Sequence, residues 1–143
     1  MPFFHDQSRD QLRQLYLEAW RKHHQRLPLE PLEAQIADVI LAHPEYHALL
    51  EDTERALQAD FSPERGVSNP YLHMGIHLAI REQVDTDRPA GIRAAYQALV
   101  QRHGEHEAQH VIGECLGRAL WEAQRAGRAP DEQAYLESVR RLP

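Results

Sequence analysis

The chain has 143 residues, about one domain, and its 42% hydrophobic content is ordinary for a globular protein with a core. A net charge of −6 at pH 7, without a dense Lys/Arg run, argues against nucleic acid as a partner. The single cysteine, Cys115, excludes an internal disulfide. The lack of a membrane-length apolar run or a signal-peptide pattern predicts a cytoplasmic protein without a membrane span.

Helix start and stop signals follow one another along the whole chain. Ser8 can cap a first helix to about Arg26, and Pro31 opens a second that ends near Ala42. Later signals predict a third helix from Pro44 that carries Leu57, a fourth from Pro70 to Val84, a fifth over 92–102, a sixth over 105–126 and a seventh from Pro130. No segment alternates with the period of a strand. We therefore predict an all-α fold, a compact single domain over residues 1–143 with six or seven helices around the long helix 105–126.

Histidine is the outlier of the composition, with 10 in the chain, and two pairs of histidines have helical spacing. His73 and His77 lie at the margin of the aliphatic side of the fourth helix. His106 and His110 lie at the start of the long helix, where His110 shares a stripe with Glu114. Side chains four residues apart on a helix are neighbours, so each pair can reach one common point.

The long helix is predicted to have two packed sides. Cys115 falls on an ordinary aliphatic face and is expected to be an inert core residue. Gly113, Gly117 and Trp121 fall on a second face. Each glycine lowers helix propensity by about 1 kcal/mol relative to alanine, which is easier to understand if another backbone packs there. Trp121, like Trp20 on the first helix, stands at helical spacing with aliphatic residues and is predicted to lie in the core.

Neutral imidazoles together with a carboxylate form a ligand set for zinc or iron, and two facing helices can supply one. The candidate ligands are His73, His77, His110 and Glu114, with His106 and His47 in reserve. His43 and His47 are discounted as a chelating pair because Pro44 between them breaks the helix. The alternative is that these histidines are structural, since chance alone produces some i,i+4 pairs in a histidine-rich chain.

Residues 106–110 also match H-E-x-x-H, in which two histidines hold zinc and the glutamate is the general base. In a hydrolase of this kind Glu107 would be catalytic, and Glu114 or another carboxylate would be the third ligand. The motif is short, Leu116 stands where a metzincin has its third histidine, and no strand is predicted to hold a peptide. His106 also lies in the first helical turn, where the helix dipole disfavours a cation.

Four blocks carry a resemblance to a known family: HPEYHALLED, NPYLHMGIHLAIREQ, GIRAAYQAL and HEAQHVIGECLGRALWEAQR. Their order and spacing resemble an uncharacterised family of short, all-helical bacterial proteins that is known as a domain of unknown function. The resemblance covers nearly the whole chain and implies a small cytoplasmic protein. It implies no activity, substrate or cofactor.

The sequence therefore leaves three functions open, and whether the chain is an enzyme stays open with them. The first is a helical protein that binds a transition metal through histidine and glutamate, with or without catalysis. The second is a non-catalytic interaction module with structural histidines, in which apolar residues near Phe3, Phe4 and Leu29 dock a protein partner or a second copy. The third is the H-E-x-x-H zinc hydrolase.

Overall fold

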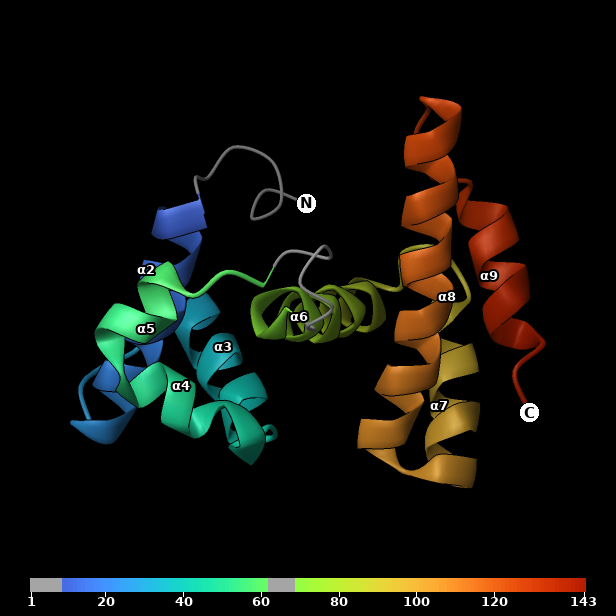
Figure 1. Cartoon of the computed structure of the whole chain (residues 1–143). Coiled ribbons are helices and arrows are strands. Elements are labelled where there is room, and N and C mark those ends of the chain that lie inside the picture. Colours follow the sequence, from blue (N-terminus) through green and yellow to red (C-terminus); the bar gives the residue numbers. More distant parts are fainter. Residues whose placement is uncertain (1–8, 62–68) are drawn as a thin grey trace. The chain divides into compact units, whose positions relative to one another are not determined.

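The computed structural model describes residues 9–61 and 69–143, and every regular element in these ranges is helical, which confirms the all-α prediction (Figure 1). The elements are α2 (Arg9–His24), α3 (Pro31–Leu41), the 3-10 helix η1 (Pro44–Tyr46), α4 (His47–Glu51), α5 (Thr53–Gln58), α6 (Pro70–Thr86), α7 (Ile92–His103), α8 (Glu105–Ala126) and α9 (Glu132–Arg140). The predicted cap Ser8 lies outside the described residues. None of these helices is long and apolar enough to cross a membrane.

Two compact units divide the chain within α6: unit 1 (Met1–Leu78) and unit 2 (Ala79–Pro143). Unit 1 buries one cluster of aliphatic and aromatic side chains contributed by α2 to α6. Its members are Tyr16, Ala19, Trp20, Ile36, Val39, Ile40, Leu49, Leu50, Ala56, Tyr71, Met74 and Leu78. On α2 and α3 these positions recur three and four residues apart, so each helix turns one face inward. The prediction of one domain over residues 1–143 stays a prediction.

The segment from Pro44 to Gln58 differs from the single helix predicted from the sequence. It is divided into η1, α4 and α5, and the chain leaves the helical region at Asp52, where φ is −106° and ψ is 90°. The Asp52 carboxylate accepts a hydrogen bond from the backbone N–H of Arg55 at 3.2 Å. Aspartate favours such a capping position because it satisfies a backbone N–H at the start of a helix. The prediction was wrong because Asp52 begins a new helix instead of lying within one.

Arg13 of α2 is a buried cation that connects α2 to the end of α5. Its Nη1 donates to the backbone carbonyls of Ala56 (3.3 Å), Leu57 (3.1 Å) and Ala59 (2.8 Å). Its guanidinium carbon also lies 4.8 Å from the centre of the Tyr71 ring of α6. The last carbonyls of a helix have no partner within it, so Arg13 satisfies those of α5 with charged hydrogen bonds.

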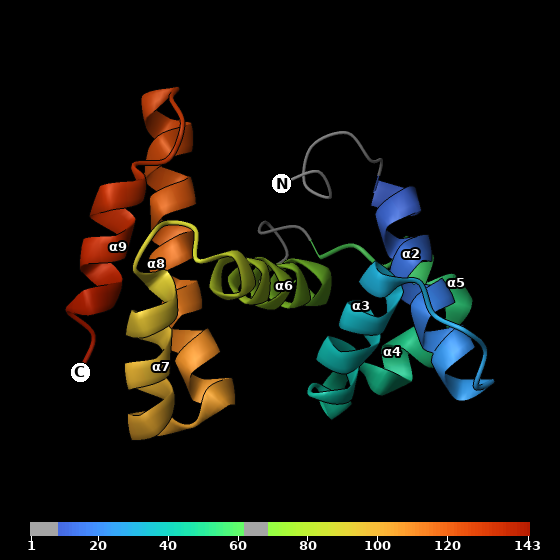
Figure 2. The ribbon, with the colours of Figure 1, turned by 180° about the vertical axis from the view of Figure 1, so that it is seen from behind.

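In unit 2, α7, α8 and α9 pack against one another, and both views show them side by side (Figures 1 and 2). The predicted long helix 105–126 is confirmed as α8. Gly104 and Gly127 bound it with φ of 85° and 66°, a region that glycine adopts without a Cβ clash. Its buried residues are Ala108, Gln109, Ile112, Cys115, Leu116 and Ala123, so the core position predicted for Cys115 is confirmed.

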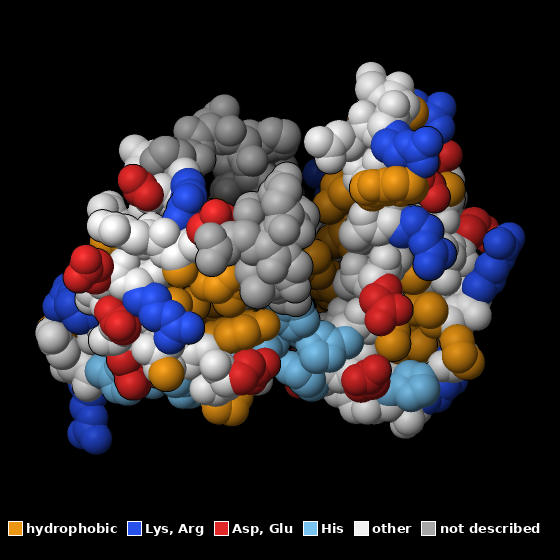
Figure 3. Space-filling model, in the orientation of Figure 1, with side chains coloured by type: hydrophobic (Ala, Val, Ile, Leu, Met, Phe, Trp, Pro, Cys, Tyr) orange, Lys and Arg blue, Asp and Glu red, His pale blue; other side chains and the backbone are white. Residues whose placement is uncertain are grey.

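The second face of α8 is not packed at Gly117 and Trp121, where we predicted that it would be. Trp121 is 55% exposed and Leu120 is 41% exposed, and Figure 3 shows hydrophobic side chains on the surface over the second half of α8. A Cβ added at Gly117 would meet no heavy atom within 4 Å. Gly117 is therefore not required by a close backbone contact. Trp20, by contrast, lies in the core of unit 1 as predicted.

Candidate metal centre

The first half of α6 places two histidines on the same side of the helix. Asn69 caps this helix, since its Oδ1 accepts from the backbone N–H groups of Tyr71 (2.9 Å) and Leu72 (3.3 Å). One helical turn then separates His73 from His77, and the centres of their rings lie 4.9 Å apart. His77 is 2% exposed, whereas His73 is half-buried.

A third histidine comes from the segment that follows α3. His43 is 1% exposed, and its ring centre lies 5.0 Å from that of His73 and 4.6 Å from that of His77. Its Nδ1 lies 2.8 Å from the backbone carbonyl oxygen of Val39, one turn earlier. A carbonyl oxygen only accepts, so Nδ1 carries the proton in this hydrogen bond. In the neutral ring the lone pair is therefore on Nε2.

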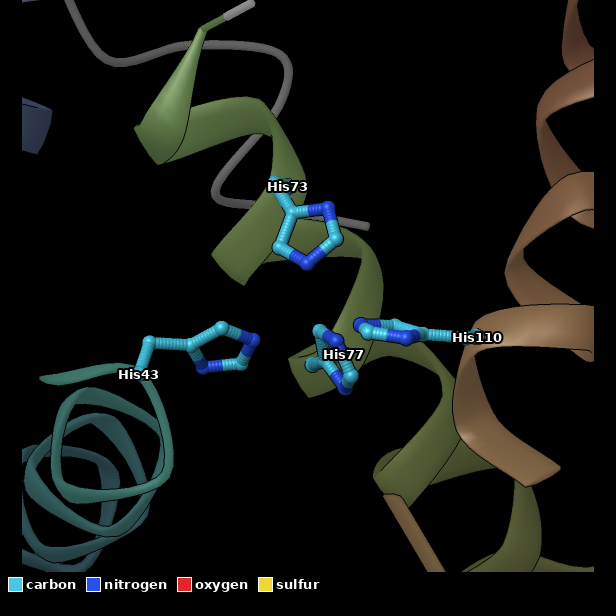
Figure 4. A group of neighbouring side chains, drawn as sticks. All are labelled: His43, His73, His77 and His110. Atoms are coloured by element: carbon cyan, nitrogen blue, oxygen red, sulfur yellow. The ribbon is translucent and has the colours of Figure 1, made fainter. Parts of the chain in front are cut away.

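His43, His73 and His77, which we call the unit 1 triad, each offer one ring nitrogen, and these nitrogens lie within 4.8 Å of one another (Figure 4). A tetrahedral zinc ion with Zn–N bonds of about 2.0 Å holds its ligand nitrogens about 3.3 Å apart. The difference of about 1.5 Å is one that small adjustments of the His73 and His77 rings would have to close when a metal binds. The unit 1 triad can thus hold a metal ion in a largely buried place.

Tyr46, at the end of η1, supports one side of the triad. Its ring stacks on His43 with 5.5 Å between centroids and 10° between planes, and it lies 6.2 Å from His73. Burial raises the pKa of the Tyr46 phenol, and the nearby Glu45 carboxylate acts in the same direction. The phenol is therefore neutral near pH 7, and a flat uncharged ring restricts the orientation of His43.

Sequence reasoning missed His43. The helix break predicted at Pro44 is confirmed, since α3 ends at Leu41 and η1 begins at Pro44, so His43 and His47 share no helix. Discounting His43 and His47 as a chelating pair left His43 out of the candidate ligands altogether. In the structure, His43 lies beside His73 and His77 of α6. The reserve ligand His47 stands apart from the triad: its Nε2 lies 2.8 Å from the carbonyl oxygen of Ile40, and its ring lies 4.6 Å from Trp20. The one signal for His43 was its position directly after an apolar helix face ending in Val39 and Ile40.

The other predicted site residues belong to α8 in unit 2. His110, which Figure 4 also labels, is half-buried, and its ring centre lies 4.3 Å from that of His106. Its Nδ1 lies 3.9 Å from a carboxylate oxygen of Glu107. His106, Glu107 and Glu114 are exposed. Among the described residues, none of these three belongs to a group of three possible ligands, so the third ligand that an H-E-x-x-H hydrolase requires is not found there.

Comparison with known proteins gives one family. The chain matches the family described as Domain of unknown function (DUF1841) over residues 8–141. No curated protein and no solved structure gives a significant match. The resemblance to a domain of unknown function that the histidine-containing blocks indicate is confirmed. Because the match leaves out only residues 1–7 and 142–143, the chain belongs to the DUF1841 family.

Proposed function

We propose that this protein binds a divalent transition metal ion through His43, His73 and His77. The observation that carries the proposal is the orientation of His43: its Nδ1 is bound to the Val39 carbonyl, which leaves Nε2 as the nitrogen that would ligate. Histidines that ligate metals almost always donate their other N–H to a carbonyl or carboxylate, which fixes the tautomer and the ring. The burial of His43 and His77 and the stacked Tyr46 ring further support a preorganised site.

Zinc and iron fit this ligand set, because both bind neutral imidazole nitrogen. Three histidines match the number of protein ligands in catalytic zinc sites, where solvent or substrate takes the remaining position. A centre with three histidine ligands therefore has room for a substrate at the metal. The ligand roles predicted for His110 and Glu114 of unit 2 stay predictions, and single variants test them.

The test is elemental analysis of the tag-free full chain after reconstitution with zinc or iron(II), beside two single variants. We expect a near-stoichiometric metal content in the parent and a strongly reduced content in His73→Ala. This variant is chosen because His73 is half-buried, so its removal disturbs the core less than removal of His77. Circular dichroism checks that the variant stays folded.

The matched control is His24→Ala, which removes an exposed histidine of the same unit outside the triad. It should keep the parent's metal content. A parent without metal after reconstitution, or equal losses in the two variants, would rule out the proposed centre.

Docking of a protein partner is the second candidate function, and one observation favours it. Leu120 and Trp121 are adjacent, both are more than 40% exposed, and Arg125 lies over the Trp121 ring at 4.6 Å from its centre. Tryptophan and arginine are enriched at the energetic centres of interfaces. Light scattering of the parent and of Trp121→Ser tests association between copies: an assembly of the parent that the variant loses supports this candidate. Of the apolar residues first predicted to dock a partner, Phe3 and Phe4 lie outside the described residues and Leu29 is half-buried.

A further inference from the structure

We propose that the metal ion in the unit 1 triad binds a small exogenous anion as an additional ligand. This inference rests on the proposed function and names the class of molecule that the centre recognises. Azide, formate and hydrogen carbonate represent that class, since each is small, carries a single negative charge and has a donor atom for a metal.

The three ligands of the unit 1 triad carry no charge. His43, His73 and His77 bind as neutral imidazoles, and among the described residues no aspartate, glutamate or cysteine joins them in a group of possible ligands. A divalent ion there keeps its full charge of 2+, with His43 and His77 almost completely shielded from solvent. A buried charge without a counter-charge is strongly unfavourable, so an anion at the metal is favoured.

The number of ligands in the triad leaves a coordination position for an anion. Three nitrogens leave one position of a tetrahedral ion open, and zinc can also expand to five ligands. His43 and His77 are buried, whereas His73 is half-buried, so His73 is the member of the triad that solvent reaches. An anion that enters past one imidazole edge has to be small.

The predicted ligands of unit 2 affect this argument in different ways. His110 as a fourth ligand would leave the charge at 2+, because its imidazole is neutral, and a fifth position would take the anion. Glu114 as a fourth ligand would supply the negative charge itself. The experiment therefore includes a variant of each residue.

The test uses cobalt(II) as a visible probe in the tag-free full chain, followed by titration with sodium azide to about 100 mM. We expect cobalt to give the intense visible bands of a four- or five-coordinate centre. Azide should then change these bands in a saturable way, with a Kd on the order of 1 mM. The His24→Ala control should behave like the parent, and His73→Ala should lose both the cobalt bands and the response to azide.

The outcomes separate this inference from the proposed function. Absence of cobalt bands in the parent contradicts metal binding itself. Cobalt bands that azide leaves unchanged contradict the anion site and leave the metal site standing. In that case azide binding only in Glu114→Gln would show that Glu114 is the native anionic ligand. Azide binding only in His110→Ala would show that His110 fills the position. Both results overturn the inference.

Discussion

Two histidine pairs with the same i,i+4 spacing have different surroundings in the two units. His77 of α6 is almost completely buried, and His43 from another segment lies 4.6 Å away between ring centres. His106 of α8 is exposed, and its described ring partner is His110 of the same helix. Spacing on a helix brings two imidazoles together in both cases. Burial and a third histidine from a separate element distinguish the α6 pair from the α8 pair within their own units.

The largest effect that we expect from this difference between the two pairs is on the thermal stability of the zinc-bound protein. Zinc at about 1,000 times its Kd stabilises a native state by about 4 kcal/mol, because it binds the folded chain only. At 2–4 °C per kcal/mol, this corresponds to a rise in Tm of roughly 10 °C, measured by circular dichroism with zinc and with a chelator. The zinc-dependent rise should disappear in His43→Ala and persist in His106→Ala. The reverse result would assign the metal to the α8 pair.

Arg13→Met tests how strongly the core of unit 1 supports the α6 pair. The change removes charged hydrogen bonds to the carbonyls at the end of α5, together with the contact to the Tyr71 ring of α6. We expect a loss of about 2–3 kcal/mol of unfolding free energy, since one buried and two partly buried carbonyls lose their donor. Hydrogen–deuterium exchange should quicken in peptides of α5 and of the first half of α6 more than in peptides of unit 2.

The control for this prediction is Arg21→Met on the same helix. Arg21 is exposed and binds Glu18 and Gln25 of α2, so its removal should change the unfolding free energy far less than Arg13→Met does. Equal effects of the two variants would show that the burial of Arg13 contributes nothing special to unit 1.

The sequence predicts those parts of the fold that local chemistry determines. Gly104 and Gly127 bound α8 because both adopt a positive φ, and this punctuation is visible in the sequence. The separation of α4 from α5 was missed because aspartate is acceptable both on an exposed helix face and at a cap. At Asp52 the chain takes the capping conformation, and a tertiary interaction accompanies it: Arg13 binds the end of α5 from more than 40 residues away.

In the candidate centre, too, the local features could be predicted from the sequence and the tertiary contact could not. His73 and His77 could be paired from the sequence because they lie one turn apart on one helix. His43 could not, because helical periodicity carries no information about contacts between segments 30 residues apart. The packing predicted beside Gly117 and Trp121 was wrong for a related reason: glycines lower helix propensity wherever they stand, and Gly117 has open space beside it.

Gly117→Ala sharpens the comparison by changing unit 2 alone. With no heavy atom near the new Cβ, the variant should gain up to about 1 kcal/mol of stability from helix propensity. Urea unfolding measures the gain, and metal affinity should stay unchanged. Gly127→Ala is the matched control: at φ of 66° an alanine is strained, so this variant should lose about 1 kcal/mol. A loss in Gly117→Ala would restore the idea of a packed second face.

Glu33→Gln should have the smallest effect, and that effect depends on pH. The backbone N–H of Glu30 (2.8 Å) and Lys22 Nζ (2.9 Å) lower the pKa of the Glu33 carboxyl below its ordinary value. A lowered folded-state pKa stabilises the protein above the unfolded-state pKa, and this stabilisation is lost as pH falls through the folded-state value. The parent should therefore have a higher urea midpoint than Glu33→Gln at pH 7, and the two midpoints should approach each other as pH falls below the ordinary carboxyl pKa of about 4. A difference that persists in acid would mean that Glu33 acts through packing instead of charge. Because Glu33 belongs to unit 1, loss of the zinc-dependent rise in this variant would show that the triad depends on the contact between α2 and α3 as well as on its own three rings.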